Sequence, residues 1–183
     1  MLRFDIDSNW KARSGMRHKW LWLGLVAGCM VQFSALAEEA AYPARVRVYQ
    51  EGEITLYPGA YCYSEDNPEK ILAAEIGFTI FSTHKRLGMP ETGDIKLNYN
   101  EYVVPGGKPV TVKLFWQAEK NGMRASCGPL ASTFYPQAGH DYDISLGYAT
   151  GCFIQIRELF TIGKDKATAT PAPSGASYPC RAG

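Results

Sequence analysis

The clearest alternation of apolar and polar side chains in the chain lies in the segment PVTVKLFWQ, residues 109–117. Successive side chains of a β-strand point to opposite faces, so this period of two predicts a strand with one buried face. Four apolar side chains share that face: Val110, Val112, Leu114 and Trp116. We expect this strand to lie at the centre of the core.

Other segments repeat the pattern and are separated by turn residues. Residues 44–50 (ARVRVYQ) and 53–57 (EITLY) alternate in the same way and predict half-buried strands. Turn residues occur at 105–107 (PGG) and at Asn121-Gly122, the pair that a two-residue type I′ hairpin requires, and we predict a hairpin at each. Strands at short spacing with turns between them predict an antiparallel β-sandwich or barrel.

One segment departs from the strand pattern. In DNPEKILAAEIG, Asn67 can cap a helix, Pro68 suits its first position, and good helix formers follow. We therefore predict one short helix over about 68–76. The next stretch, residues 78–94, becomes a long polar connection, and long loops on β scaffolds often carry binding residues.

The N-terminal 37 residues read as an export signal. The basic MRHKW precedes an apolar run that ends in ALA, a small-x-small cleavage site, and Met16 opens a signal of ordinary proportions. The mature chain would then start at Glu38 in the periplasm. An alternative is a lipoprotein, because LVAGC resembles a lipobox, and Cys29 would then carry the lipid anchor.

The remaining chain divides into a domain and a tail. Residues 38–162 hold the strand patterns and enough apolar side chains for one core. Residues 163–183 are rich in Ala, Thr, Pro, Ser and Gly, so we predict a flexible tail there.

Charge excludes two classes of partner. Removing residues 1–37 takes away five of the 19 basic and two of the 18 acidic side chains, leaving 14 basic and 16 acidic. A slightly acidic chain without a basic run has no electrostatic footprint for nucleic acid or for an anionic membrane surface. Contact with a membrane is expected only through the alternative lipid anchor.

Four cysteines remain after the signal: Cys62, Cys127, Cys152 and Cys180. An even number in an exported chain predicts two disulfides, and no CxxC or zinc-type ligand spacing is present. We favour Cys127–Cys152, provided that the Gly128-Pro129 bend curls Cys127 over a strand end. Cys62 would then be free or joined to Cys180, and the main rival pairing is Cys62–Cys127.

The turn between Pro136 and Tyr142 is similar to the tyrosine corner of secreted β-sandwiches. In that corner the tyrosine hydroxyl bonds to backbone groups a few residues upstream. We therefore expect a structural role for Tyr142. His140 and Asp141 are neighbours on a strand and should point to opposite faces, so they are not expected to share a catalytic site.

Several segments together carry a resemblance to a known group: ARVRVYQ, LGMPET, EYVVPGGKPVTV, CGPLASTFYPQAGHDYDISL and GCFIQIREL. Over residues 44–160 the chain resembles small, mostly uncharacterised proteobacterial envelope proteins, often lipoproteins, with immunoglobulin-like or transthyretin-like domains. The resemblance implies an all-β, antiparallel Ig-like or transthyretin-like β-sandwich. It brings no catalytic residues.

Two surfaces are candidates for binding another protein. The segment YPGAYCYSEDN gathers Tyr57, Tyr61 and Tyr63, and tyrosine is enriched in recognition surfaces. The second is the loop HKRLGMPET, with His84, Lys85, Arg86 and a Met89 that we expect to be exposed.

Motifs for catalysis, metal ions and cofactors are not found in the sequence. The leading hypothesis is therefore a non-catalytic envelope protein that binds a protein partner or supports an assembly, and an inhibitor or immunity factor is one form of it. The alternative is a glycan-binding protein or hydrolase that uses acidic residues. Its candidates are Glu65, Asp66, Glu69, Glu91, Asp94 and Glu101.

Overall fold

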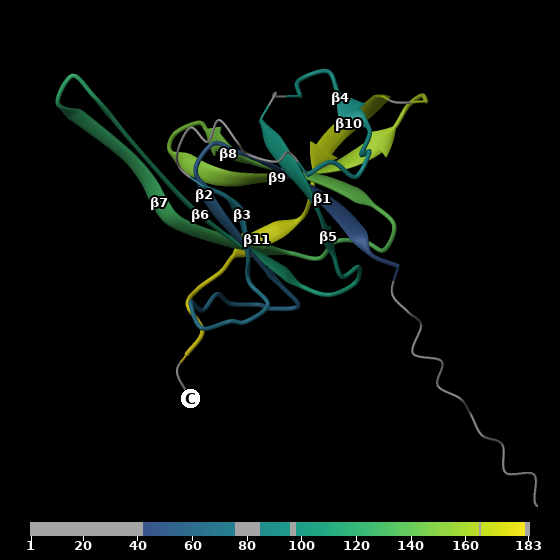
Figure 1. Ribbon diagram of the computed structural model, residues 1–183, viewed down its shortest axis with the longest axis horizontal. Helices are drawn as coiled ribbons and strands as arrows, with labels where there is room; N and C mark the ends of the chain where they lie inside the picture. The colour runs from purple at the N-terminus through teal and green to yellow at the C-terminus, as the bar shows by residue number, and fades with distance from the viewer. Residues whose placement is uncertain (1–41, 76–84, 96–97, 165, 182–183) are drawn as a thin grey trace, which may run out of the picture. The chain divides into compact units, whose positions relative to one another are not determined.

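The computed structural model describes residues 42–75, 85–95, 98–164 and 166–181 (Figure 1). The predicted export signal, Cys29 and His84 lie outside these residues. Within the described part of the chain, no helix is long and apolar enough to cross a membrane.

The described residues form β-strands in two sheets, as the alternation predicts. The strands are β1 (Ala44–Tyr49), β2 (Glu53–Pro58), β3 (Ile71–Ala74), β4 (Glu91–Thr92), β5 (Tyr99–Val104), β6 (Val110–Lys120), β7 (Met123–Phe134), β8 (Asp141–Tyr148), β9 (Cys152–Thr161), β10 (Lys166–Pro171) and β11 (Ser174–Ala176). Sheet A has the order β4-β10-β9-β8-β1-β5, and sheet B has the order β11-β7-β6-β2-β3. The predicted all-β, sandwich-like class is confirmed.

Side chains from both sheets build the core. On β6, Val110, Val112 and Leu114 are fully buried, and they pack in one cluster with Val46 and Val48 of β1. The expected central strand is therefore confirmed. Burial of such side chains removes apolar surface from water at about 25 cal/mol per Å², which is the main favourable term in folding.

The β6–β7 hairpin turns at the predicted dipeptide, whereas the hairpin predicted at 105–107 is wrong, because that turn leads from β5 in sheet A to β6 in sheet B. Asn121 has φ 54° and Gly122 has φ 75°, the two positive values that a type I′ turn requires. The ladder places Cys127 opposite Trp116, as expected from this turn. Both strands are long, and Figure 1 shows the hairpin extending as an arm well beyond the other strands.

The predicted helix over 68–76 is wrong for its described residues. Asn67 accepts a hydrogen bond from the Glu69 amide at 2.8 Å and another, at its carbonyl, from the Lys70 amide at 3.3 Å, which closes a turn. Residues 71–74 then form β3, paired with β2. Ala73 and Ala74 are buried there, so core packing and strand pairing override a weak local helix propensity.

The predicted flexible tail is also wrong for its described residues. β10 pairs with β9 in sheet A, and β11 pairs with β7 in sheet B. Backbone hydrogen bonds require no large side chains, so a segment poor in apolar residues still adds strands to existing sheet edges. The fold therefore continues almost to the C-terminus.

Two disulfides are present, Cys127–Cys152 and Cys62–Cys180. The favoured pairing is confirmed, with a Cα separation of 5.8 Å between Cys127 and Cys152. Cys62 is joined to Cys180 across 5.0 Å, so it is not free, and the rival Cys62–Cys127 is excluded. Both separations lie within the usual range for a disulfide.

The tyrosine corner is confirmed. The backbone amide of Gln137 donates to the Tyr142 hydroxyl at 2.9 Å. The neighbouring pair separates as expected, because His140 contacts Glu158 whereas Asp141 bonds to Arg45.

Candidate functional site: a tyrosine surface

The three tyrosines of the predicted binding segment have different environments. Tyr61 is 65% exposed, Tyr63 is half-buried, and Tyr57 is fully buried. Tyr57 points from the outer face of sheet B, where the following loop covers it, and burial raises the pKa of its hydroxyl. Tyr57 is therefore not a surface residue, and that part of the prediction is wrong.

Two further tyrosines join Tyr61 in space. The ring of Tyr135, which follows β7 and is 54% exposed, lies 5.9 Å from the Tyr61 ring in an edge-to-face arrangement. Tyr178, which follows β11, is 72% exposed. Its carbonyl accepts from the Tyr63 amide at 3.2 Å, so its backbone adjoins the Tyr61 loop. We call Tyr61, Tyr135 and Tyr178 the tyrosine surface.

Hydroxyl groups of sheet B and the C-terminal segment hold the loop that carries Tyr61. The Tyr61 carbonyl accepts from Ser177 Oγ at 2.8 Å and from Thr133 Oγ1 at 3.3 Å. Thr111 Oγ1 donates to the Ala60 carbonyl at 2.8 Å. These bonds fix the backbone on both sides of an exposed ring.

The disulfide Cys62–Cys180 locks the same loop to the C-terminal segment. The Cys180 amide also donates to the Tyr63 carbonyl at 2.9 Å. Together with the hydroxyl bonds from sheet B, this disulfide holds three segments that are distant in sequence together. A preorganised aromatic surface loses little conformational entropy when it binds a partner.

At the tyrosine surface, electrostatics favour a neutral hydroxyl on Tyr135. The pKa of Tyr135 is raised, first because of its hydrogen bond with Tyr61. Nearby, Glu65 forms ion pairs with Lys113 and Lys70, and the hydrogen bond from Lys113 is the main cause that lowers the pKa of Glu65. The Tyr135 hydroxyl is thus an uncharged donor and acceptor, and the nearby carboxylate of Glu65 is engaged by two lysines.

Sequence reasoning identified Tyr61 but missed Tyr135 and Tyr178. A Cys62–Cys180 bond, which the sequence left as one option, would have placed Tyr178 near Tyr61. Tyr135 has no comparable signal, because its approach depends on the pairing of β6 with β7 and on the loop that covers sheet B.

The second predicted surface is only partly exposed. Lys85 and Arg86 are exposed, but Met89 is only 5% exposed and packs against Leu159 and Ala167. The prediction of an exposed Met89 is therefore wrong. The Arg86 guanidinium lies 3.4 Å from the centre of the Tyr99 ring.

A buried ion network explains why Met89 is covered. Arg47 is fully buried and donates to Glu101 at 3.1 Å, to Asp143 at 3.4 Å, and to the carbonyls of Met89 and Pro90. Glu101 accepts in addition from the amides of Leu87 and Met89. These bonds therefore hold residues 87–90 over the outer face of sheet A.

The acidic candidates are dispersed, and three of the six form ion pairs within the chain. Glu101 is 1% exposed and bound to Arg47, while Asp94 pairs with Arg157. Glu65 pairs with two lysines, and the other acidic candidates are exposed: Asp66, Glu69 and Glu91. Among the described residues, no group of three or more His, Cys, Asp or Glu side chains is arranged to hold a metal ion.

Comparison with known proteins gives no relative. No protein-family model, no curated protein and no solved structure matches this chain. The chemistry of the site therefore rests on its own geometry.

Proposed function

We propose that this protein is a non-catalytic, exported envelope protein that binds another protein through the tyrosine surface. The observation that carries the proposal is that Tyr61, Tyr135 and Tyr178 leave more than half of each side chain exposed. Their backbone segments, in contrast, are tied by hydrogen bonds and a disulfide. Exposed rings on a fixed backbone are typical of a recognition surface.

Tyrosine suits this role for physical reasons. Its ring buries a large apolar area with only two side-chain torsions to order, and its hydroxyl retains a polar contact at the rim of an interface. Aromatic anchors are among the residues whose truncation costs most, typically about 2 kcal/mol or more. A few such side chains can supply most of the binding energy.

The disulfides support the proposed compartment. Two disulfides fit an oxidising environment, such as the periplasm, in which thiols are not kept reduced. We infer export to the periplasm, with cleavage before Glu38. The alternative, a lipid anchor at Cys29, predicts a longer and heavier mature protein, and the intact mass of protein purified from the envelope distinguishes the two.

Within the sandwich class, we infer the transthyretin-like form. In an immunoglobulin constant-type domain the first two strands share a sheet. Here β1 lies in sheet A and β2 in sheet B, and β1 pairs in parallel with β8. This arrangement supports the transthyretin-like half of the resemblance over the immunoglobulin-like half.

The test is affinity capture of the tagged protein from its native envelope after crosslinking. We expect a stoichiometric partner whose recovery falls about tenfold or more in a Tyr61→Ala, Tyr135→Ala variant. The matched control is Ile162→Ala, which removes an exposed apolar side chain after β9 in the other sheet. If the partner is an envelope enzyme or a toxin, a loss of its activity on adding the purified protein would identify an inhibitor.

Two outcomes would refute the proposal. Equal recovery of the partner by the tyrosine variant and by Ile162→Ala would exclude this surface. Retention on cell-wall glycan without a protein partner would favour the glycan-binding alternative instead, and turnover of that material would identify a hydrolase.

A further inference from the structure

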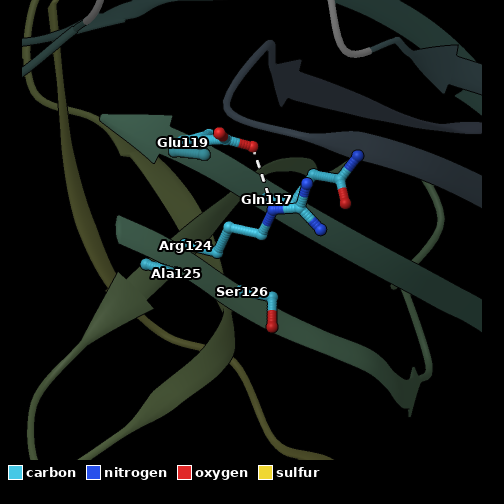
Figure 2. A pocket seen from close by; sticks show the side chains of 6 residues that line it. Gln117, Glu119, Arg124, Ala125 and Ser126 are labelled. Atoms are coloured by element: carbon cyan, nitrogen blue, oxygen red, sulfur yellow. Dashed lines mark hydrogen bonds and ion pairs between the residues drawn. The ribbon is translucent and has the colours of Figure 1, made fainter. Parts of the chain in front are cut away.

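The outer half of the β6–β7 hairpin, residues 117–126, is exposed on both faces, and we call it the arm. Figure 2 shows the hollow beside it, with Arg124 reaching across to Glu119, and the two side chains are 2.9 Å apart. An isolated two-stranded ribbon is only marginally stable in water. Within the described part of the chain, nothing packs on either face of the arm.

Both edges of the arm are also open in the described part of the chain. β2 pairs with β6 only from Val110 to Phe115. β11 pairs with β7 only from Ser132 to Phe134. Unpaired edge strands present backbone donors and acceptors that another extended strand can complete, and β11 shows that this edge of β7 accepts one.

The hairpin register determines which backbone groups are free. Lys120 and Met123 flank the two-residue turn, so they exchange hydrogen bonds with each other, and the pairs alternate from there. Arg124 and Ser126 therefore direct their N–H and C=O groups toward the open edge of β7. Pairing must stop at Gly128-Pro129, because proline has no N–H to donate.

Apolar side chains are exposed at both ends of this open edge. Met123, at the tip, is 71% exposed, and Tyr148, whose ring contacts Trp116, is exposed at the root. At the root, where the arm joins the rest of the sheet, a hollow of about 220 Å³ lies between β7 and β9. Its lining residues are Leu130, Ala131, Ser132, Cys152, Phe153 and Ile154.

We propose that two copies of this protein pair through their arms, β7 against β7, in antiparallel orientation about a two-fold axis at Ala125. Arg124 then lies opposite Ser126 of the second copy, and their free backbone groups form hydrogen bonds. Met123 lies opposite Cys127 of the second copy, whose disulfide partner Cys152 lines the root hollow, so the exposed tip of each copy approaches the root hollow of the other.

The arm is self-complementary, as an interface on a two-fold axis must be. The tip and the root are four residues apart along β7, or about 14 Å at 3.4 Å per residue, and antiparallel pairing exchanges these two positions. Arg124 faces a serine, so no like charges are placed directly opposite one another. The Ala125 side chains meet at the axis and are small enough for close approach.

An extended segment of a different protein is the rival occupant of this edge. It would use the same backbone groups, but no residue of this chain would then lie opposite the equivalent residue of a second copy. The two cases therefore differ in whether Ala125 of one copy lies opposite Ala125 of a second copy.

The first test is a cysteine at the two-fold axis. In this pairing the Ala125 Cα atoms are about 4.5 Å apart, so Ala125→Cys should form an intermolecular disulfide. Ala118→Cys is the matched control on the same face one strand away, where the two copies are separated by three strand spacings, about 14 Å, which is too far. Mass spectrometry of non-reduced peptides identifies the crosslink in the purified, oxidised protein.

The second test is sedimentation equilibrium of the wild type and of Met123→Asp. Since Met123 is exposed within one copy, the variant should fold normally, and we expect dimer affinity to fall about tenfold or more. A protein that stays monomeric, equal crosslinking at residues 118 and 125, or a dimer unaffected by Met123→Asp would overturn the proposal. Monomers that bind an added partner through the arm would establish the rival.

Discussion

Replacing Arg47 by alanine should destabilise the protein more than any surface charge substitution. Arg47 is fully buried and holds Glu101 and Asp143, whose side chains are 1% and 0% exposed. Removing it leaves Glu101 without a cation and Asp143 with Arg157 alone, in a site that water does not reach. The carbonyls of Met89 and Pro90 also lose a donor.

The magnitude follows from the cost of an uncompensated buried charge. Removing one partner of a buried ion pair typically costs about 3–5 kcal/mol. For a domain of this size, that corresponds to a fall in Tm of about 10–15 °C. Arg124→Ala is the control, because the side chains of Arg124 and Glu119 are mostly exposed and such pairs are worth about 0–1 kcal/mol.

The effect should depend on pH with a definite sign. Burial raises the pKa of Asp143, so its contribution to stability is present at acid pH and is lost as the pH rises through the folded-state pKa. Arg47 opposes that rise. In Arg47→Ala the pKa of Asp143 goes up further, so the deficit relative to the wild type should be larger at about pH 7 than at about pH 4.

Chemical denaturation of both variants and the wild type, with the disulfides intact, measures these deficits. A loss below about 1 kcal/mol at neutral pH would refute the reasoning, since it would mean that water or another cation satisfies the carboxylates. A deficit that shrinks as the pH rises would refute the assigned sign.

Three further outcomes follow from the structure. Replacing Cys62 and Cys180 by serine opens a loop of 118 residues, and the chain-entropy relation gives a loss of about 4.9 kcal/mol, measurable by thermal unfolding against the wild type. Tyr142→Phe keeps the ring but removes the acceptor for the Gln137 amide, so we expect a loss of about 1 kcal/mol; no loss would mean that this bond adds nothing. Gly122→Ala forces a side chain into φ 75° at the tip of the hairpin and should cost about 1 kcal/mol, with the chemical shifts of the core unchanged.

The strand pattern and the turns were accessible from sequence because both are local. Alternation in residues 109–117 predicts a strand with a side-chain period of two. Asn121-Gly122 predicts the positive φ angles of the turn that follows it. The position of Tyr142 after a proline turn indicated its corner for the same reason. Each of these signals lies within a few residues of the structure that it predicts.

The burial of individual faces was decided only by the tertiary structure. Alternation in residues 44–50 places Arg47 on the polar face of a strand, yet residues 85–95 cover that face and bury the guanidinium among carboxylates. Residues 71–74 have helix-forming side chains, but pairing with β2 and burial of Ala73 make them a strand.

The tyrosine surface depends on the tertiary structure in the same way. Its three rings come from segments joined by strand pairing, hydroxyl bonds and the Cys62–Cys180 disulfide. A local sequence pattern predicts backbone geometry and periodicity. The exposure of a side chain and its contacts depend instead on which distant segment covers that face of the sheet. Sequence alone therefore determined the fold class and its turns, and long-range packing decided which residues reach the surface.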